Sequence, residues 1–158
     1  MYKRQAIPDE WRLLVANPDR YTFISDEEKI IAIPAEYTTD YKLLDQHLDL
    51  LHAGITVTTL KGKDYVPHIS LALSTAFDTN KVVHYEASLD TALAYLRRES
   101  LFLPTDLPRG YILVTYEGFP LGWVKHLGNR TNNLYPQEWR IRSGHTPDTP
   151  FELNIAPK

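Results

Sequence analysis

The sequence predicts an α+β fold built from many short strands and two clear helices. Alternating or β-branched stretches at residues 21–33, 55–60 and 110–126 are typical of strands. Leucines recur at helical spacing in two other stretches, 39–51 and 88–96. The chain has 158 residues, 43% of them hydrophobic, which is enough to bury a core as one domain or as two small ones.

The first 81 residues are expected to form one small α+β unit. Near its amino end, Trp11, Leu14 and Val15 fit one helical turn. Residues 21–33 predict a β-hairpin, because the polar turn at 25–28 favours a chain reversal and Pro34 stops the second strand.

A leucine-rich helix should follow this hairpin in the stretch "TTDYKLLDQHLDLLHAG". Either Thr39 or Asp40 is suited to cap its start, and Gly54 to follow its end. Its expected apolar stripe consists of Leu43, Leu44, His47, Leu48 and Leu51. A strand at 55–60 should then turn at 61–64, and Pro67 is placed for the first turn of another helix.

Residues 82–143 predict a second unit that is mostly β with one helix. "VVHYEAS" is a strand, and "YILVTYEG" and "LGWVKHLGN" should pair across the turn "EGFP". Ser88 is expected to cap the helix, whose buried stripe is Leu89, Ala92, Leu93 and Leu96.

The end of the chain predicts one more strand and then a tail. "WRIRS" alternates, which places Arg140 and Arg142 on one face of that strand. Residues 144–158 contain three prolines and little periodicity, so they are expected to form a flexible tail.

Several kinds of chemistry are excluded by what the chain lacks. It has no cysteine, which removes disulfides, cysteine metal ligands and cysteine nucleophiles. It contains neither of the nucleotide-binding loops G-x-G-x-x-G and G-x-x-x-x-G-K-[ST]. It also has no G-x-S-x-G nucleophile turn and no H-x-x-x-H pair among its six histidines. We therefore expect no cofactor, no metal and no catalytic residue in this chain. No signal-peptide pattern and no membrane-length apolar run occur, so we expect a soluble, cytoplasmic protein.

Charge is unevenly distributed along the chain. Residues 1–96 carry 9 Lys/Arg and 14 Asp/Glu, whereas residues 97–142 carry 7 and 4. This imbalance fits a protein with one charged working face, although chance alone gives swings of this size.

Residues 120–143, "PLGWVKHLGNRTNNLYPQEWRIRS", concentrate the side chains that suit RNA. Cations neutralise phosphates, amides read base edges or brace a tight loop, and aromatic rings stack on bases or fill a core. For Trp123 and Trp139 both base stacking and core packing remain open. The predicted RNA-binding residues are Lys125, His126, Asn129, Arg130, Asn132, Asn133, Tyr135, Arg140 and Arg142.

The same stretch closely resembles the C-terminal end of the Sun/Fmu family of RNA cytosine-5 methyltransferases, which includes RsmF and the nucleolar Nop-type proteins. The residues that carry the resemblance are Gly110, Pro120, Leu121, Gly122, Trp123, Lys125, Asn132, Asn133, Tyr135, Pro136 and Arg140. The helix "SLDTALAYLRRE" and the upstream segment "LLHAGITVTTLKGKDYVPHISLALS" extend the resemblance to roughly residues 20–142. Arg98 departs from the family, which usually has glycine there.

The resemblance implies a PUA-like, mostly-β RNA-binding barrel at 82–143, packed on a small RRM-like or ferredoxin-like unit at 1–81. The family's enzymes also carry an S-adenosylmethionine-binding core and use cysteines, and this chain has neither. We therefore expect a non-catalytic module that docks ribosomal RNA for a methyltransferase core in cis or in trans. The alternatives are a protein-interaction or ribosome-assembly module without RNA contact, and an enzyme that uses a ligand pocket of its own.

Overall fold

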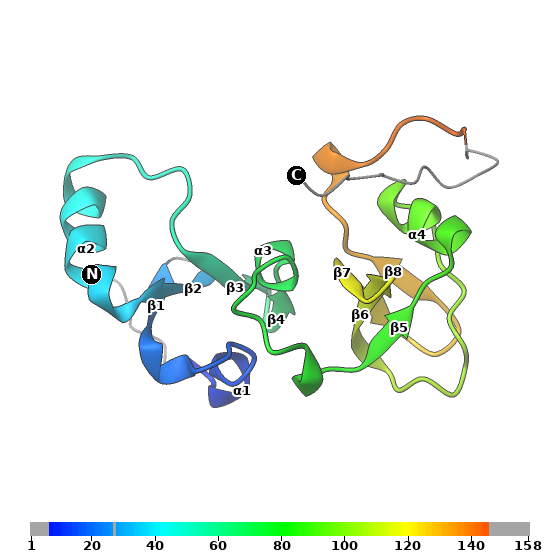
Figure 1. The fold of residues 1–158 in the computed structure, drawn as a ribbon, viewed down its shortest axis with the longest axis horizontal. Coiled ribbons are helices and arrows are strands. Elements are labelled where there is room, and N and C mark those ends of the chain that lie inside the picture. Colours follow the sequence, from blue (N-terminus) through cyan, green and yellow to red (C-terminus); the bar gives the residue numbers. More distant parts are fainter. Residues whose placement is uncertain (1–6, 27, 146–158) are drawn as a thin grey trace, which may run out of the picture.

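Two four-stranded β-sheets lie side by side in the computed structural model, which describes residues 7–26 and 28–145 (Figure 1). The first sheet has the order β1 (Tyr21–Asp26), β2 (Lys29–Pro34), β3 (Ile55–Lys61), β4 (Asp64–Pro67). The second has the order β5 (His84–Glu86), β6 (Gly110–Tyr116), β7 (Phe119–His126), β8 (Thr131–Asn133). Together with a few short helices, these sheets confirm the predicted α+β class.

Every neighbouring pair of strands in the first sheet is antiparallel and follows chain order. The predicted hairpin is confirmed, with β1 and β2 paired from Tyr21↔Pro34 to Asp26↔Lys29. Helix α2 (Thr38–His47) lies between β2 and β3, and these two strands pair antiparallel. The described residues therefore contain no split βαβ crossover in this sheet. The RRM-like or ferredoxin-like arrangement expected for residues 1–81 is therefore not confirmed.

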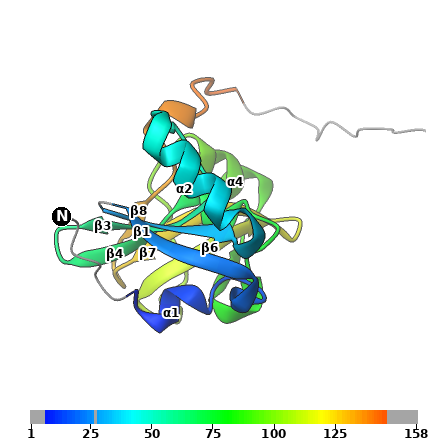
Figure 2. The ribbon, with the colours of Figure 1, turned by 90° about the vertical axis from the view of Figure 1, so that its left-hand side faces the viewer.

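Short helices and 3-10 turns precede the first sheet, connect its strands and lead to the second sheet. They are α1 (Asp9–Arg12), η1 (Pro18–Arg20), η2 (Ala35–Tyr37), α3 (Ile69–Ala72) and η3 (Thr79–Lys81). Helix α1 contains Trp11 of the predicted helical turn but ends before Leu14 and Val15. Pro67 ends β4, and α3 begins only after His68. In Figure 2, α1 and α2 lie on opposite sides of the first sheet.

The second sheet mixes one parallel pair with two antiparallel pairs. Helix α4 (Leu89–Leu96) makes the crossover between the parallel strands β5 and β6. Its cap is the predicted one, since the Ser88 hydroxyl accepts the N–H of Thr91 at 3.3 Å. The described strands form an open sheet, so the closed barrel implied by the resemblance is not seen in this part of the chain.

Residues 139–142 do not form the predicted last strand. Instead a 3-10 turn, η4 (Gln137–Trp139), follows Pro136. The N–H of Ile141 donates to the carbonyl of Leu96 at 3.0 Å, so this backbone group serves the end of α4 rather than a strand ladder. The last strand is β8, whose sequence "TNN" lacks the apolar alternation that identifies a strand. Of the predicted tail, residues 146–158 lie outside the described part of the chain.

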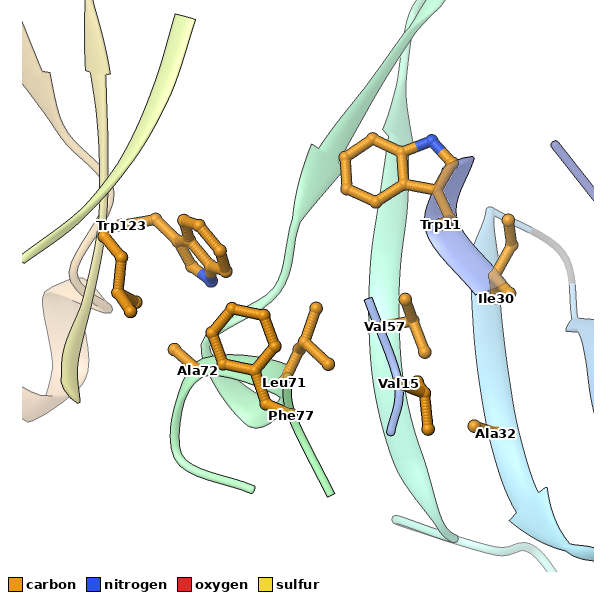
Figure 3. Packing of buried hydrophobic residues seen from close by; sticks show 10 residues of the cluster. Trp11, Val15, Ile30, Ala32, Val57, Leu71, Ala72, Phe77 and Trp123 are labelled. Atoms are coloured by element: carbon orange, nitrogen blue, oxygen red, sulfur yellow. The ribbon is translucent and has the colours of Figure 1, made fainter. Parts of the chain in front are cut away.

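The two sheets share one hydrophobic core. Trp123 of β7 is 2% exposed and packs between the sheets, with its ring centroid 5.4 Å from that of Phe77 (Figure 3). The same cluster includes Trp11, Val57 and Leu113. The indole N–H of Trp123 donates to the carbonyl of His68 at 3.1 Å, so this side chain is committed to the core. The division between residues 81 and 82 stays a prediction.

The opposite face of the second sheet packs on α4. Ile112, Val114 and Val124 form a second cluster with Ala92 and Tyr95 of that helix. This division follows from strand alternation, because neighbouring residues on a strand point to opposite faces. The predicted helical stripe missed Tyr95, which is fully buried, whereas three of the four predicted positions are only half-buried.

Helix α2 is shorter than predicted, and its leucine stripe is exposed. It ends at His47, and none of its residues is buried. Leu43, Leu44 and Leu48 are 58%, 46% and 57% exposed. Helices in proteins gain most of their stability from burying an apolar face. Because these leucines are exposed, they do not stabilise further helical turns toward Gly54. Figure 1 places α2 at the end of the molecule away from the second sheet.

Arg98 occupies a backbone position that suits the glycine implied there by the resemblance. It follows the end of α4 with φ of +65°, in the left-handed region where glycine has no steric cost. Its N–H donates to Tyr95, and the N–H of Glu99 reaches back to Ala94, which is the Schellman pattern. The arginine side chain adds contacts that glycine lacks, to the carbonyl of Tyr135 at 2.8 Å and to Gln137 at 2.5 Å.

His68 makes the stability of α3 sensitive to pH. Its Nδ1 accepts the N–H of Ser70 at 3.1 Å, which caps the helix and requires an unprotonated Nδ1. Burial, followed by the nearby cation Lys29, lowers the pKa of His68 from its ordinary value of 6.5. Because the unfolded chain then takes up the proton first, the stability supplied by neutral His68 is present above about pH 6.5 and is lost as pH falls below it.

We expect the urea midpoint of the native protein to be lower at about pH 5.5 than at about pH 7.5. The same change of pH should lower the midpoint of His68→Asn by less. An asparagine carbonyl can keep the cap but does not titrate. Parallel decreases in both proteins would show that other groups cause the pH dependence.

Candidate nucleic-acid interface

One face of the second sheet carries a row of three polar side chains. In the register of the strands, Lys125 of β7 pairs with Tyr111 of β6 on one side and with Asn132 of β8 on the other. Residues directly opposite each other on paired strands point to the same face, so the three side chains lie next to one another. This face also carries Trp123, and it therefore looks toward the first sheet.

Lys125 is held in place by two partners. Its ammonium lies 3.8 Å from a carboxylate oxygen of Asp64 and 5.4 Å from the centre of the Tyr111 ring. The side chains of Lys125 and Asp64 are 35% and 73% exposed, so solvent weakens the ion pair and the cation remains accessible. Asp64 belongs to the first sheet, which means that both sheets contribute to the surroundings of this lysine.

The two adjacent asparagines point to opposite faces of the second sheet. Asn132 is exposed beside Lys125. Asn133 instead donates both amide hydrogens to the end of α4, to the carbonyls of Tyr95 at 2.9 Å and Glu99 at 3.0 Å. Its carbonyl accepts the N–H of Tyr135 at 2.9 Å. Asn133 therefore fastens β8 to α4, and its polar groups already have partners within the chain.

His126 does not reach the surface. Its side chain is 1% exposed on the face that packs on α4, and neither ring nitrogen has a partner among the described residues. The sequence analysis placed it among the RNA-binding residues as one of the basic side chains that can reach phosphates. Strand alternation turns it to the other side of the sheet.

The tip of the β7–β8 hairpin is basic. Asn129 and Arg130 are exposed there. Arg109, just before β6, extends its guanidinium over Gly128, where an added Cβ would lie 3.0 Å from its Nε. The sequence analysis missed Arg109, because it lies outside the 120–143 stretch and only the pairing of Gly110 with His126 brings it near the tip.

The remaining predicted residues lie on the α4 side of the sheet. The ring of Tyr135 packs between Tyr95 and Trp139, with centroid distances of 5.4 and 6.4 Å. Arg140 and Arg142 are exposed in the segment that follows. Arg97 holds that segment to α4 through hydrogen bonds to the carbonyls of residues 143 and 145. The structure thus divides the predicted site between two sides of the second sheet.

Two kinds of feature are absent from residues 7–26 and 28–145. Within these ranges, no cluster of three or more His, Asp or Glu side chains is arranged to hold a metal ion. In the same residues, no helix has the length and apolar character needed to cross a bilayer.

The second sheet coincides with a known domain. Residues 82–141 match the family described as the methyltransferase RsmF PUA domain. A ribosomal RNA small subunit methyltransferase F from Erwinia tasmaniensis is 30% identical over 84 residues, which is 53% of this chain and 17% of that protein. A protein of the same name from Shewanella sediminis is 39% identical over 59 residues, 37% of this chain and 12% of that protein.

These matches concern one part of much larger relatives, since the matched segments span less than a fifth of either protein. The family match is confined to the PUA domain, which has an RNA-binding role in that family. Residues 82–141 are therefore similar to the PUA domain of the RsmF-like ribosomal RNA methyltransferases.

Proposed function

We propose that this chain is a non-catalytic module that docks ribosomal RNA for a cytosine-5 RNA methyltransferase in the cytoplasm. The observation that carries the proposal is the match of residues 82–141 to the RsmF PUA domain. The proposed module needs no cofactor of its own, because positioning RNA requires only surface contacts to phosphates and bases.

The row of Tyr111, Lys125 and Asn132 supports this function. It offers an aromatic ring, a cation and an amide on one partly exposed strip, which together suit a base face, a phosphate and a base edge. Of the predicted residues, Asn129 and Arg130 extend the basic surface at the hairpin tip, whereas Asn133 and His126 are left out because of their internal positions.

Two substitutions test this face, one at each residue of the Lys125–Asp64 ion pair, and they should change RNA affinity in opposite directions. Lys125→Ala should weaken RNA binding by roughly tenfold and lower the slope of log affinity against log salt by about one, because one phosphate contact is lost. Asp64→Asn should strengthen binding, because it removes the carboxylate that competes for Lys125. Fluorescence anisotropy with labelled small-subunit ribosomal RNA fragments across a salt series measures both effects.

Arg140→Ala serves as the comparison on the α4 side. A loss of affinity in Arg140→Ala, together with unchanged affinity in both Lys125→Ala and Asp64→Asn, would move the RNA site to that side. If the native protein binds no RNA at low salt, the proposed function is wrong.

For the methyltransferase partner we propose the exposed stripe of α2 as the contact. Leu43 and Leu44 are exposed on α2, and Leu48 and Leu51 are exposed in the segment just after its end. Contiguous exposed apolar side chains mark interaction surfaces. The relatives extend far beyond the matched segment, so a catalytic domain is the natural occupant of this face. The same face supports the alternative of a protein-interaction module.

We expect the double change Leu43→Glu and Leu48→Glu to abolish binding to the catalytic part of the Erwinia tasmaniensis relative, prepared without its PUA domain. Both positions are exposed, so the free energy of unfolding should change by less than about 0.5 kcal/mol per site. Isothermal titration calorimetry measures the binding, with Gln46→Glu as the control on the same helix. Equal affinity of the double variant and the control would contradict the α2 contact.

A further inference from the structure

A cleft of about 660 Å³ opens between the two sheets. One wall comes from β4 and the turn before it, with Tyr65 and Lys63. The other comes from β6 and β7, with Tyr111 and Lys125. Lys81 of η3, in the connection between the sheets, adds a third cation. The volume lies in the range of small-ligand sites.

Tyr65 and Tyr111 line this cleft with partly exposed rings, and each ring contacts a neighbouring side chain. Tyr65 packs against the buried Trp11, with ring centroids 6.2 Å apart. Tyr111 lies under the ammonium of Lys125. A ring that is already held in position loses little conformational freedom when a ligand stacks on it.

The charges around the cleft favour an anion that also carries a flat ring. Lys63, Lys81 and Lys125 outnumber the two acidic residues of the lining, Glu10 and Asp64. Asp64 is largely exposed and makes only a solvent-screened ion pair, so it can release Lys125 to a competing phosphate. An aromatic surface with several cations at its edge is the combination that binds unpaired nucleotides.

We propose that the cleft between the sheets takes a single unstacked nucleotide of the bound RNA strand. The base stacks on Tyr65 or Tyr111, and the flanking phosphates lie against Lys63, Lys81 and Lys125. The inference rests on the proposed RNA-binding function and adds to it the unit of RNA bound and the place of binding. It also assigns part of the contact to the first sheet, which lies outside the matched PUA domain.

Photo-crosslinking and affinity measurements on the full chain test this proposal. The probe is a single-stranded oligouridine of about eight nucleotides that carries one 4-thiouridine. We expect ultraviolet crosslinks to the peptides that contain Tyr65 or Tyr111. Tyr65→Leu and Tyr111→Leu keep apolar bulk but remove the stacking ring, and each should weaken binding of the oligonucleotide by roughly tenfold. Tyr37→Leu, at an exposed ring beside α2, should leave affinity unchanged.

The double variant Lys63→Gln and Lys81→Gln is a second test. It does not disturb the packing of the core, because both side chains are exposed. It should weaken oligonucleotide binding several-fold and reduce its salt slope by about two. Native affinity in the tyrosine and lysine variants, with crosslinks outside the cleft, would overturn the nucleotide site while RNA binding itself stands. The same holds if the native protein binds structured ribosomal RNA but not the oligouridine. Absence of binding to either RNA would overturn the proposed function as well.

Discussion

Replacing Gly122 by alanine should lower the free energy of unfolding by about 3 kcal/mol, of which roughly 1–2 kcal/mol is backbone strain and the rest overpacking. Gly122 has φ of +146°, which side-chain-bearing residues rarely adopt. It is buried in β7, beside the point where the pairing with β6 shifts register. An added Cβ would collide with the hydroxyl of Tyr95 and with Cδ1 of Ile69.

Both of these neighbours are buried. Tyr95 is fully buried, and its hydroxyl donates to the carbonyl of Trp123 at 3.3 Å. Burial raises the pKa of Tyr95 far above its ordinary value, so the phenol stays protonated as a donor. Ile69 begins α3, and therefore Gly122 is the point at which β7 touches both helices.

Gly118→Ala is the matched control. Gly118 also has positive φ, +77°, but lies at the exposed β6–β7 turn, where an added Cβ meets nothing within 4 Å. Its replacement should cost about 1 kcal/mol, from backbone strain alone. Chemical denaturation of both variants measures the difference. Equal losses would show that the packing around Gly122 yields and that the collision contributes nothing.

Asn133→Ala should destabilise the protein by about 2 kcal/mol, whereas Asn132→Ala should change stability by less than about 0.5 kcal/mol. The first change removes two hydrogen bonds that join β8 to the end of α4 and a third from the N–H of Tyr135, and it leaves the carbonyl of Glu99 without this partner. The second changes an exposed side chain next to Lys125.

RNA affinity should respond in the opposite way. Asn132→Ala is expected to weaken RNA binding several-fold, while Asn133→Ala, measured at a temperature where it is folded, should bind as the native chain does. Urea denaturation and anisotropy on the same preparations separate the two effects. If Asn133→Ala kept its stability and lost RNA binding, Asn133 would be an RNA contact, as the sequence analysis predicted.

The local elements of this protein follow from its sequence, because their signals are local. The hairpin of β1 and β2, the pairing of β6 and β7 and the Ser88 cap of α4 depend on alternation, turn residues and a capping hydroxyl within a few positions. The likeness to a PUA domain was also readable from residues 110–142, and the match at residues 82–141 confirms it.

The composition of the candidate site was predictable only in part. The nine predicted residues are neighbours in sequence, but a strand sends successive side chains to opposite faces. The short strand β8 and the turn after Pro136 are what separate Asn132 from Asn133 and carry Arg140 to α4. Neither has an apolar pattern, so the sequence could not reveal which of these residues share a surface.

The sequence by itself determined the β1–β2 hairpin, the pairing of β6 and β7, the Ser88 cap, the PUA likeness and the basic stretch. The tertiary structure decided the strand order of the first sheet, the exposure of the α2 leucines and the cleft that joins Tyr65 and Lys63 to Lys125. The physical reason is that these features depend on contacts between segments far apart in the chain. Whether a leucine stripe is buried, or a lysine meets a tyrosine, is set by which surface packs against it rather than by its own periodicity.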